Sequence, residues 1–431
     1  MPSELRLYLL ESIRTNTLLN FFAHGQRIMK NKILFSALLS GLAGTVISGS
    51  LFADYTAELS GNISLDSRLF FNDARYPDQD EHSFSIAFEP EYYASWDDGD
   101  QRLVMQPFFR YDANDKERTH ADFREFYWRG SFEDVELTVG AAKVFWGVAE
   151  SNHLVDIINQ TDLIENPDGE DKLGQPMVNL AFIKDWGTLE FFALPYFRER
   201  TFAGKDGRLR GPLVIDTDHP TFESGAKEHH VDFAVRWSHY FGDWDIGLAH
   251  FSGTSREPIF VPGLDSGGNP VLIPHYQQID QTSLDLQATK GDWLWKLEAI
   301  SSRDNNGRYT AFVGGFEYTM VGILDSVHDL GLLLEYHFDD RDELATSGLQ
   351  NDVFAGLRWV LNDVQSTEVL AGAIVDSDSQ ATFASIEASR RVGDYWKITM
   401  EARAFTNLEP AESLYIVRDD DYLELQITRY F

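Results

Sequence analysis

The fold is decided by the stretch Tyr55-Thr56-Ala57-Glu58-Leu59-Ser60-Gly61-Asn62-Ile63-Ser64-Leu65-Asp66-Ser67-Arg68-Leu69-Phe70-Phe71. Apolar side chains or glycine occupy every second position as far as Leu65 and again at Leu69 and Phe71, and polar side chains fill most positions between them. Successive side chains of a β-strand point to opposite faces. The stretch is therefore predicted to be a strand with one apolar and one polar face.

The same alternation recurs along the rest of the chain and predicts eighteen strands. Only the range 118–130 is ambiguous in phase, because Phe123, Phe126, Tyr127 and Trp128 fall on both faces. The predicted strands are 55–71, 82–96, 101–113, 118–130, 134–145, 176–184, 188–200, 230–241, 244–254, 275–290, 292–303, 308–320, 328–339, 352–361, 366–376, 380–391, 395–406 and 421–431.

The connections between these strands differ in length between the two sides of the predicted sheet. Tight turns such as Asp97-Asp98-Gly99-Asp100 and Gly393-Asp394 alternate with longer connections, which are 146–175, 201–229, 255–274, 340–351 and 407–420. All the long connections fall on one side of the predicted sheet. A transmembrane barrel has this asymmetry, with short periplasmic turns and long outer loops. An open sheet edge is too costly in lipid, so the last strand is expected to pair with the first and close the barrel.

Composition agrees with an all-β membrane protein and excludes several other classes. The 431 residues are 43% hydrophobic and 13% aromatic, with a net charge of −33 and no cysteine. The mean hydropathy of −0.29 argues against a bundle of apolar helices, whereas a barrel strand exposes only every second residue to lipid. Such an acidic chain is not expected to bind nucleic acid, and no cofactor is expected.

The N-terminal region is predicted to be a targeting signal rather than part of the fold. Met29-Lys30-Asn31-Lys32 precedes an apolar run at 33–48 and small residues before Ala53, the pattern of a secretory signal peptide spanning 29–53. Residues 1–28 are expected to reflect a misassigned start, and residues 54–431 to form one barrel domain. The alternative is a genuine N-terminal extension with an uncleaved anchor.

The C-terminal strand places Leu423, Leu425, Ile427 and Phe431 on one face. It resembles the recognition strand of Gram-negative outer-membrane proteins, in which the assembly machinery reads a terminal aromatic residue. Arg429 departs from the usual apolar residue at its position. The resemblance implies an outer-membrane location, with Leu425, Ile427 and Phe431 as the assembly signal. The expected partners are the barrel-assembly machinery, lipid and lipopolysaccharide; the oligomeric state is left open.

The connection 146–175 is the third outer loop. Its Trp146-Gly147 pair, followed by Asp156 and Asn159, resembles porin-type barrels related to alginate-export proteins, and general porins fold their third loop into the barrel. The resemblance implies a constriction that faces Arg110 or Arg236. A solvated surface loop is the alternative, and no metal site is expected. The acidic constriction candidates are Asp156, Asp162, Glu165, Asp168, Glu170 and Asp171.

Alternation also predicts charged side chains that face the lumen and select solutes. The alternative is an ordinary solvated wall of mutually paired charges. The candidates are Arg68, Glu89, Glu91, Arg110, Arg236, Lys296, Glu298, Arg358, Lys397, Glu401 and Arg403.

These patterns favour a porin-like channel for small hydrophilic solutes or ions. The first alternative is an export or secretion conduit for a polymer or other substrate, working with a periplasmic partner. The second is a barrel enzyme or an adhesin, although the sequence holds no G-x-S-x-G, H-E-x-x-H or phosphate-loop motif.

Overall fold

The computed structural model describes residues 55–341, 348–410 and 412–431. The predicted extension 1–28 and signal peptide 29–53 lie outside the described residues.

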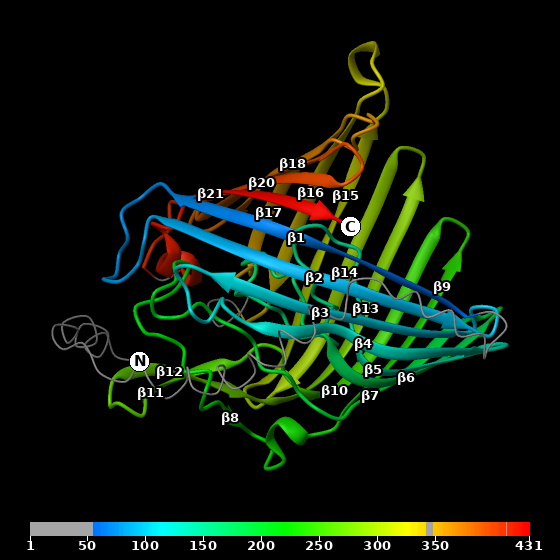
Figure 1. Cartoon of the computed structure of the whole chain (residues 1–431), viewed down its shortest axis with the longest axis horizontal. Coiled ribbons are helices and arrows are strands. Elements are labelled where there is room, and N and C mark those ends of the chain that lie inside the picture. The colour runs from blue at the N-terminus through cyan, green and yellow to red at the C-terminus, as the bar shows by residue number, and fades with distance from the viewer. Residues whose placement is uncertain (1–54, 342–347, 411) are drawn as a thin grey trace. The chain divides into compact units, whose positions relative to one another are not determined.

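An 18-stranded antiparallel barrel forms the described part of the chain (Figure 1). Each barrel strand pairs with the next one along the chain, and β21 pairs with β1 to close the ring, with Tyr430 opposite Asn62. The predicted all-β closed barrel is confirmed. The barrel strands are β1 (Thr56–Phe70), β2 (His82–Trp96), β3 (Gln101–Asp112), β4 (Ala121–Phe132), β5 (Val135–Ala142), β6 (Gln175–Lys184), β7 (Gly187–Leu194), β9 (Asp232–Phe241), β10 (Trp244–Thr254), β13 (Gln278–Lys290), β14 (Trp293–Asp304), β15 (Gly307–Met320), β16 (Asp329–Asp339), β17 (Asn351–Val360), β18 (Glu368–Asp376), β19 (Thr382–Val392), β20 (Trp396–Thr406) and β21 (Tyr422–Tyr430).

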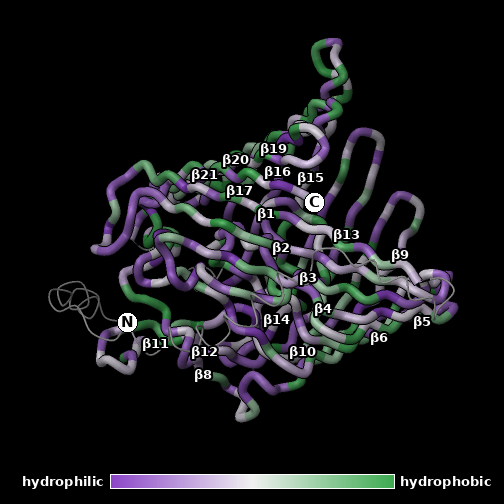
Figure 2. The backbone as a smooth tube through the Cα atoms, viewed as in Figure 1, coloured by the Kyte–Doolittle hydropathy of each residue, from purple (hydrophilic) through white to green (hydrophobic). Residues whose placement is uncertain are grey.

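Hydrophobic and hydrophilic residues alternate along the barrel strands (Figure 2), and the two faces of the wall differ accordingly. On β1, Leu65 is 42% exposed on the outer face, whereas its neighbour Asp66 is 1% exposed on the inner face. A polar interior is expected of a wide barrel, whose own side chains cannot fill the lumen. Leu425, Ile427 and Phe431 all lie exposed on the outer face of the closing strand.

A β-bulge explains the ambiguous phase of the predicted strand 118–130. Pairing between β3 and β4 shifts between Gln106 and Pro107, which oppose Glu125 and Phe123 and leave Arg124 without a partner in the ladder. The extra residue lets Phe123 and Phe126 both lie on the exposed outer face. It also leaves the Arg124 side chain buried in the interior.

The outer connections contain structure that the sequence did not predict. Within the predicted loops 201–229 and 255–274, strands β8 (Thr221–Phe222), β11 (Ile259–Leu264) and β12 (Pro270–Tyr276) form a small separate sheet. The predicted strand 275–290 is therefore wrong at its start, because the chain changes sheet between Tyr276 and Gln278. The predicted strands 134–145 and 188–200 end early, at Ala142 and Leu194, where the chain leaves the wall.

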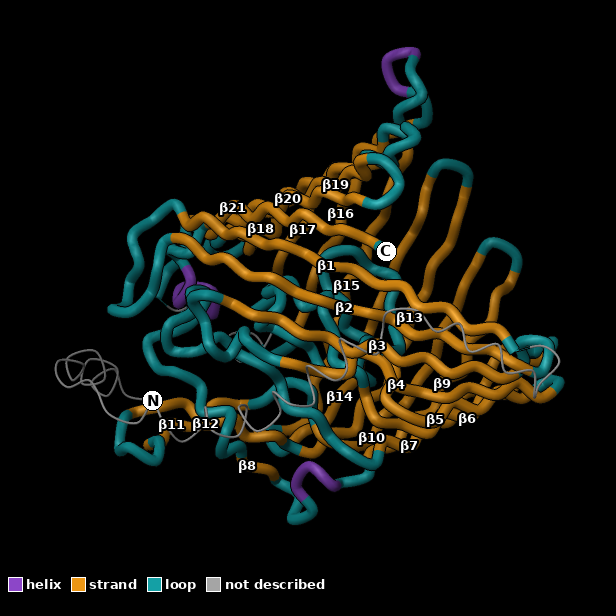
Figure 3. The backbone as a smooth tube through the Cα atoms, in the orientation of Figure 1, coloured by secondary structure: helices purple, strands orange, loops and turns teal. Residues whose placement is uncertain are grey.

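Three short 3-10 helices complete the described elements: η1 (Lys227–His229), η2 (Ile323–Asp325) and η4 (Ser413–Val417) (Figure 3). Among the described residues, no helix is long and apolar enough to cross a membrane. The longest connections share one end of the barrel, as predicted, and no connection at the other end exceeds eight residues.

Candidate functional site

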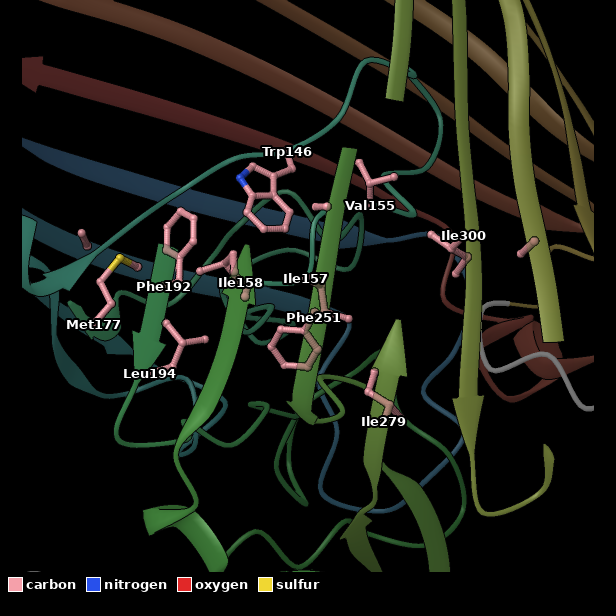
Figure 4. Close-up of a cluster of buried hydrophobic side chains, with 14 residues drawn as sticks. Trp146, Val155, Ile157, Ile158, Met177, Phe192, Leu194, Phe251, Ile279 and Ile300 are labelled. Carbon is pink, nitrogen blue, oxygen red and sulfur yellow. The ribbon is translucent and has the colours of Figure 1, made fainter. Parts of the chain in front are cut away.

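The connection between β5 and β6, residues 143–174, is called here the inner segment. Its apolar residues pack against wall side chains from eight strands, β5, β6, β7, β9, β10, β13, β14 and β15 (Figure 4). The Trp146 ring meets Phe192 edge-on at 5.6 Å between centroids, with the Arg236 guanidinium 5.0 Å from the Trp146 ring centre. The main cluster consists of Trp146, Val155, Ile157, Ile158, Phe192, Leu194, Phe251, Ile279 and Ile300.

Two buried carboxylates on the wall hold the first half of the inner segment by its backbone. Glu298 on β14 accepts hydrogen bonds from three amides, those of Val148 at 2.7 Å, Ala149 at 2.9 Å and Val155 at 3.1 Å. Glu335 on β16 accepts bonds from the amides of Glu150 at 2.8 Å and Ser151 at 2.9 Å. Glu298 is 0% and Glu335 2% exposed, so water does not compete for these bonds.

Arginines on the opposite part of the wall hold the middle of the inner segment. Arg110 on β3 lies 2.7 Å from both Asp66 and Glu165, and Arg124, the residue left over at the bulge, bonds to Asp162. Arg118 and Arg68 donate to backbone carbonyl oxygens of residues 164 and 165. A segment held by β14, β16, β3 and β4 of one closed ring must lie inside that ring.

A third cluster surrounds Arg403 on β20. Its guanidinium lies 2.9 Å from three carboxylates: Asp168 of the inner segment, Glu387 on β19 and Glu401 on the same strand. Asn166 of the inner segment donates to Glu401 at 3.0 Å. One arginine cannot neutralise three carboxylates, so the cluster has an excess of two negative charges when all are ionised.

A cavity of about 430 Å³ lies between the inner segment and the wall formed by β17 to β20. On the segment side it is lined by Glu150, Ser151, His153, Asp168 and Glu170. The wall side mixes charged, small and apolar side chains, which include Phe354, Arg358, Glu368, Leu370, Ile374, Phe383, Ser385, Glu387, Lys397 and Arg403.

Asp168 and His153 line this cavity from the inner segment and have strongly altered pKa values. Burial raises the pKa of Asp168 to about 7, against the opposing effect of Arg403. Burial alone would lower the pKa of His153, but the neighbouring carboxylates of Glu170 at 2.8 Å and Glu298 at 3.8 Å raise it to about 10. At neutral pH His153 is therefore cationic, whereas the charge of Asp168 changes near neutrality.

The predicted residues thus fall into different environments. Lys296 and Arg358 both contact Glu150, at 3.4 and 2.6 Å, and Arg68 pairs with Glu424 on β21. Of the two arginines proposed as alternatives to face the loop carboxylates, Arg110 does so through Glu165, whereas Arg236 forms a two-pronged pair with Asp285 on the wall.

The remaining predicted residues are less closely grouped. Glu89 accepts a bond from Asn62 at 3.2 Å on the wall, and Glu91 is half-buried beside it on β2. Asp156 pairs with Lys172 within the segment, and burial raises the pKa of Asp171 to about 6. Sequence reasoning missed Glu335, Arg118, Arg124 and Glu387 as contacts of the inner segment or its cavity.

Among the described residues, two sets of side chains could bring three ligand atoms to one metal ion: His120 with Asp162 and Glu165, and Asp168 with Glu387 and Glu401. In each set an arginine already binds carboxylates, Arg124 in the first and Arg403 in the second. Both sets are therefore better described as ion-pair clusters than as metal centres.

No protein-family model and no curated protein matches the sequence. Among solved structures, the chain is similar to a BenF-like porin from Pseudomonas fluorescens Pf-5, with 10% identity, coverage of 89% of this chain and 99% of that chain, and a TM-score of 0.53. It is also similar to OccK11 (OpdR) of Pseudomonas aeruginosa, with 12% identity, 88% and 96% coverage and a TM-score of 0.50. Likeness at such low identity concerns the fold alone: the chain has the fold of porin-like outer-membrane β-barrels.

Proposed function

We propose that this protein is an outer-membrane channel through which small hydrophilic solutes diffuse, with the inner segment as its constriction. The observation that carries the proposal is the 430 Å³ cavity left between the inner segment and β17 to β20. The barrel is too wide to fill itself, the segment is fixed across it, and charged side chains line the space that remains.

The same charges support a preference for cations. Around Arg403 the carboxylates carry two more charges than the guanidinium when all three are ionised, and His153 lies between Glu170 and Glu298. Arg358 and Lys296 balance Glu150 and Glu317. An excess of carboxylates beside the path raises the local concentration of cations and repels anions.

The location and partners follow from the same proposal. Export by the predicted signal peptide would deliver the chain to the outer membrane, where Leu425, Ile427 and Phe431 would be read by the assembly machinery. Lipid would cover the apolar outer face, and lipopolysaccharide would surround the outer loops. A homo-oligomer would bury part of the apolar face.

Recording currents across a planar bilayer tests the channel. The purified protein is expected to give steady, discrete conductance steps. A silent protein that hydrolyses ester or peptide substrates would instead support the barrel-enzyme alternative. A protein that is silent alone and conducts only after a periplasmic component is added would support the export conduit.

Neutralising the carboxylates around Arg403 should abolish the cation preference. In the combined variant Asp168→Asn, Glu387→Gln and Glu401→Gln, the reversal potential in a salt gradient is expected to move toward the anion side, because Arg403 loses its excess counter-charge. Glu89→Gln and Glu91→Gln on β2 are matched controls that lie outside the lining of this cavity. An unchanged reversal potential in the triple variant would show that these carboxylates do not set the cation preference.

The preference for cations is also expected to depend on pH. Because burial raises the pKa of Asp168 to about 7, its carboxyl is ionised above neutrality and gains a proton as the pH falls through 7. Cation preference should therefore weaken between pH 8 and pH 6, by about one charge at this site. The Asp168→Asn variant should show the wild-type selectivity of pH 6 at both pH 6 and pH 8. If the selectivity of the wild type is the same at pH 6 and pH 8, Asp168 does not control the pH dependence.

A further inference from the structure

Two neighbouring turns at the tight-turn end of the barrel differ from the other six. The β15–β16 connection spans 321–328 and the β17–β18 connection spans 361–367; the others contain two to four residues. The β15–β16 connection stands out from the rim of the barrel in Figures 1 and 3. The pair of connections is called here the double turn.

The tip of the double turn is apolar and open to solvent. Leu324 is 94%, Val364 95%, Val321 75% and Val327 67% exposed. The other turns at this end carry no aliphatic side chain; they read Asp97-Asp98-Gly99-Asp100, Glu133-Asp134, Asp185-Trp186, Gly242-Asp243, Gly291-Asp292 and Gly393-Asp394-Tyr395. Exposed aliphatic side chains gathered on adjoining turns are of the kind that marks an interaction site, and these four are called here the patch.

Hydrogen bonds hold this patch in one shape. Asn362 donates to the Val327 carbonyl and to Asp329, both at 2.8 Å, which ties one turn to the other. The Gly322 amide donates to Asp329 at 2.9 Å. Leu324 and Asp325 have φ values of 55° and 56°, a strained region for residues other than glycine. A rigid, strained and exposed apolar turn is typical of a pre-organised binding element.

Charge argues for the kind of partner. The double turn contains Asp325 and Asp363 and is flanked by Asp329 and Glu368, but it contains no lysine or arginine. Arg390, on β19, pairs with Asp363 at 3.1 Å. The apolar tip therefore has an acidic border. Membrane-surface segments that bind lipid carry the opposite pattern, with lysine and arginine beside the apolar residues.

Position along the strands also argues against lipid. Trp359 on β17 lies on the outer face opposite Leu330 and contacts His328 at 5.7 Å between ring centroids. Exposed tryptophans of barrels mark the edge of the membrane. The patch begins where β15 ends, beyond this tryptophan, on the side that faces the aqueous compartment.

We propose that the double turn is a docking site for a protein of the periplasm that presents an apolar groove bordered by lysine or arginine. The compartment rests on the proposed outer-membrane location, with the tight turns inward. The proposal adds a partner to the channel and is independent of which solute the channel carries.

Thiol labelling tests this docking site, because the chain contains no cysteine of its own. Leu324→Cys is labelled with a maleimide that passes the outer membrane, in native cells and in proteoliposomes of the purified protein. Asp98→Cys, in a polar turn at the same end, is the matched control. We expect Leu324→Cys to react severalfold more slowly in cells than in proteoliposomes, and Asp98→Cys to react equally in both.

The salt dependence identifies the chemistry. Labelling of Leu324→Cys in isolated envelopes should rise to the proteoliposome rate at high salt, which weakens contacts between acidic and basic groups. Val364→Cys should behave in the same way. Equal labelling rates in cells and proteoliposomes would overturn the proposal. Slow labelling in proteoliposomes would show that lipid covers the patch. Protection in envelopes that high salt does not relieve would show that the partner does not bind through lysine or arginine. Labelling can be measured whether or not the protein conducts. If the protein gives no conductance but Leu324→Cys is protected in cells, the proposed channel function is rejected and the docking site is retained.

Discussion

The Glu298→Ala variant will pass more current through each open channel than the wild type, and its open level will be noisier. The Glu298 carboxylate is the acceptor for the amides of Val148, Ala149 and Val155. Leaving a buried amide without an acceptor costs about 1–3 kcal/mol. With three amides unpaired, residues 148–155 are expected to leave the wall and move within the lumen. Single-channel recording should show a conductance higher by a factor of about two, with added flicker.

Two further variants test whether Glu298 acts by anchoring the inner segment or only by its charge. Glu298→Gln keeps an acceptor oxygen of the same size, so it should retain part of the wild-type stability of the open level. Glu190→Ala removes a carboxylate from β7 that bonds to Asn179 rather than to the inner segment, and it should leave the noise unchanged. If Glu298→Ala and Glu190→Ala behave alike, the carboxylate does not hold the segment.

The second large effect concerns stability. Arg110→Ala leaves Asp66 and Glu165 without their shared arginine, although their side chains are only 1% and 6% exposed. Removing one member of a buried ion-pair network costs about 3–5 kcal/mol, because an uncompensated charge stays in a low-dielectric site. The folded form of Arg110→Ala is therefore expected to lose its compact migration on a denaturing gel at a clearly lower temperature than the wild type.

Arg129→Ala is the matched comparison for Arg110→Ala. Arg129 also lies on the wall and pairs with Glu136 at 3.4 Å, but its side chain is 33% exposed. A solvent-exposed pair contributes about 0–1 kcal/mol, so this variant should unfold close to the wild-type temperature. Equal losses in the two variants would mean that the buried network adds nothing specific to stability.

Much of the barrel follows from the sequence because its signal is local. In β1, Leu65 and Asp66 are assigned to opposite faces by the pleat of a single strand, and the structure has them there. Turn chemistry such as Gly393-Asp394 fixes where strands reverse. Strand number, connection lengths and the polarity of each face could therefore be predicted without any tertiary contact.

The anchors of the inner segment could not be predicted in this way. Glu335 binds backbone amides 184 and 185 residues earlier in the chain, and a backbone amide has no signature in the sequence. Arg124 is directed inward by a bulge that appears in the sequence only as a broken alternation. Alternation could not decide between Arg110 and Arg236 as the arginine that meets the loop, because it gives the face of a residue but not its contacts; Arg110 meets Glu165, and Arg236 pairs with Asp285.

The central claim is that solutes pass between the inner segment and β17 to β20. Ser385→Cys, on β19, places a single thiol in the lining of that cavity. During single-channel recording, a water-soluble thiol reagent should lower the current of this variant in discrete steps and leave the wild type unaffected. A current that stays constant while mass spectrometry shows complete modification of the thiol would contradict the claim.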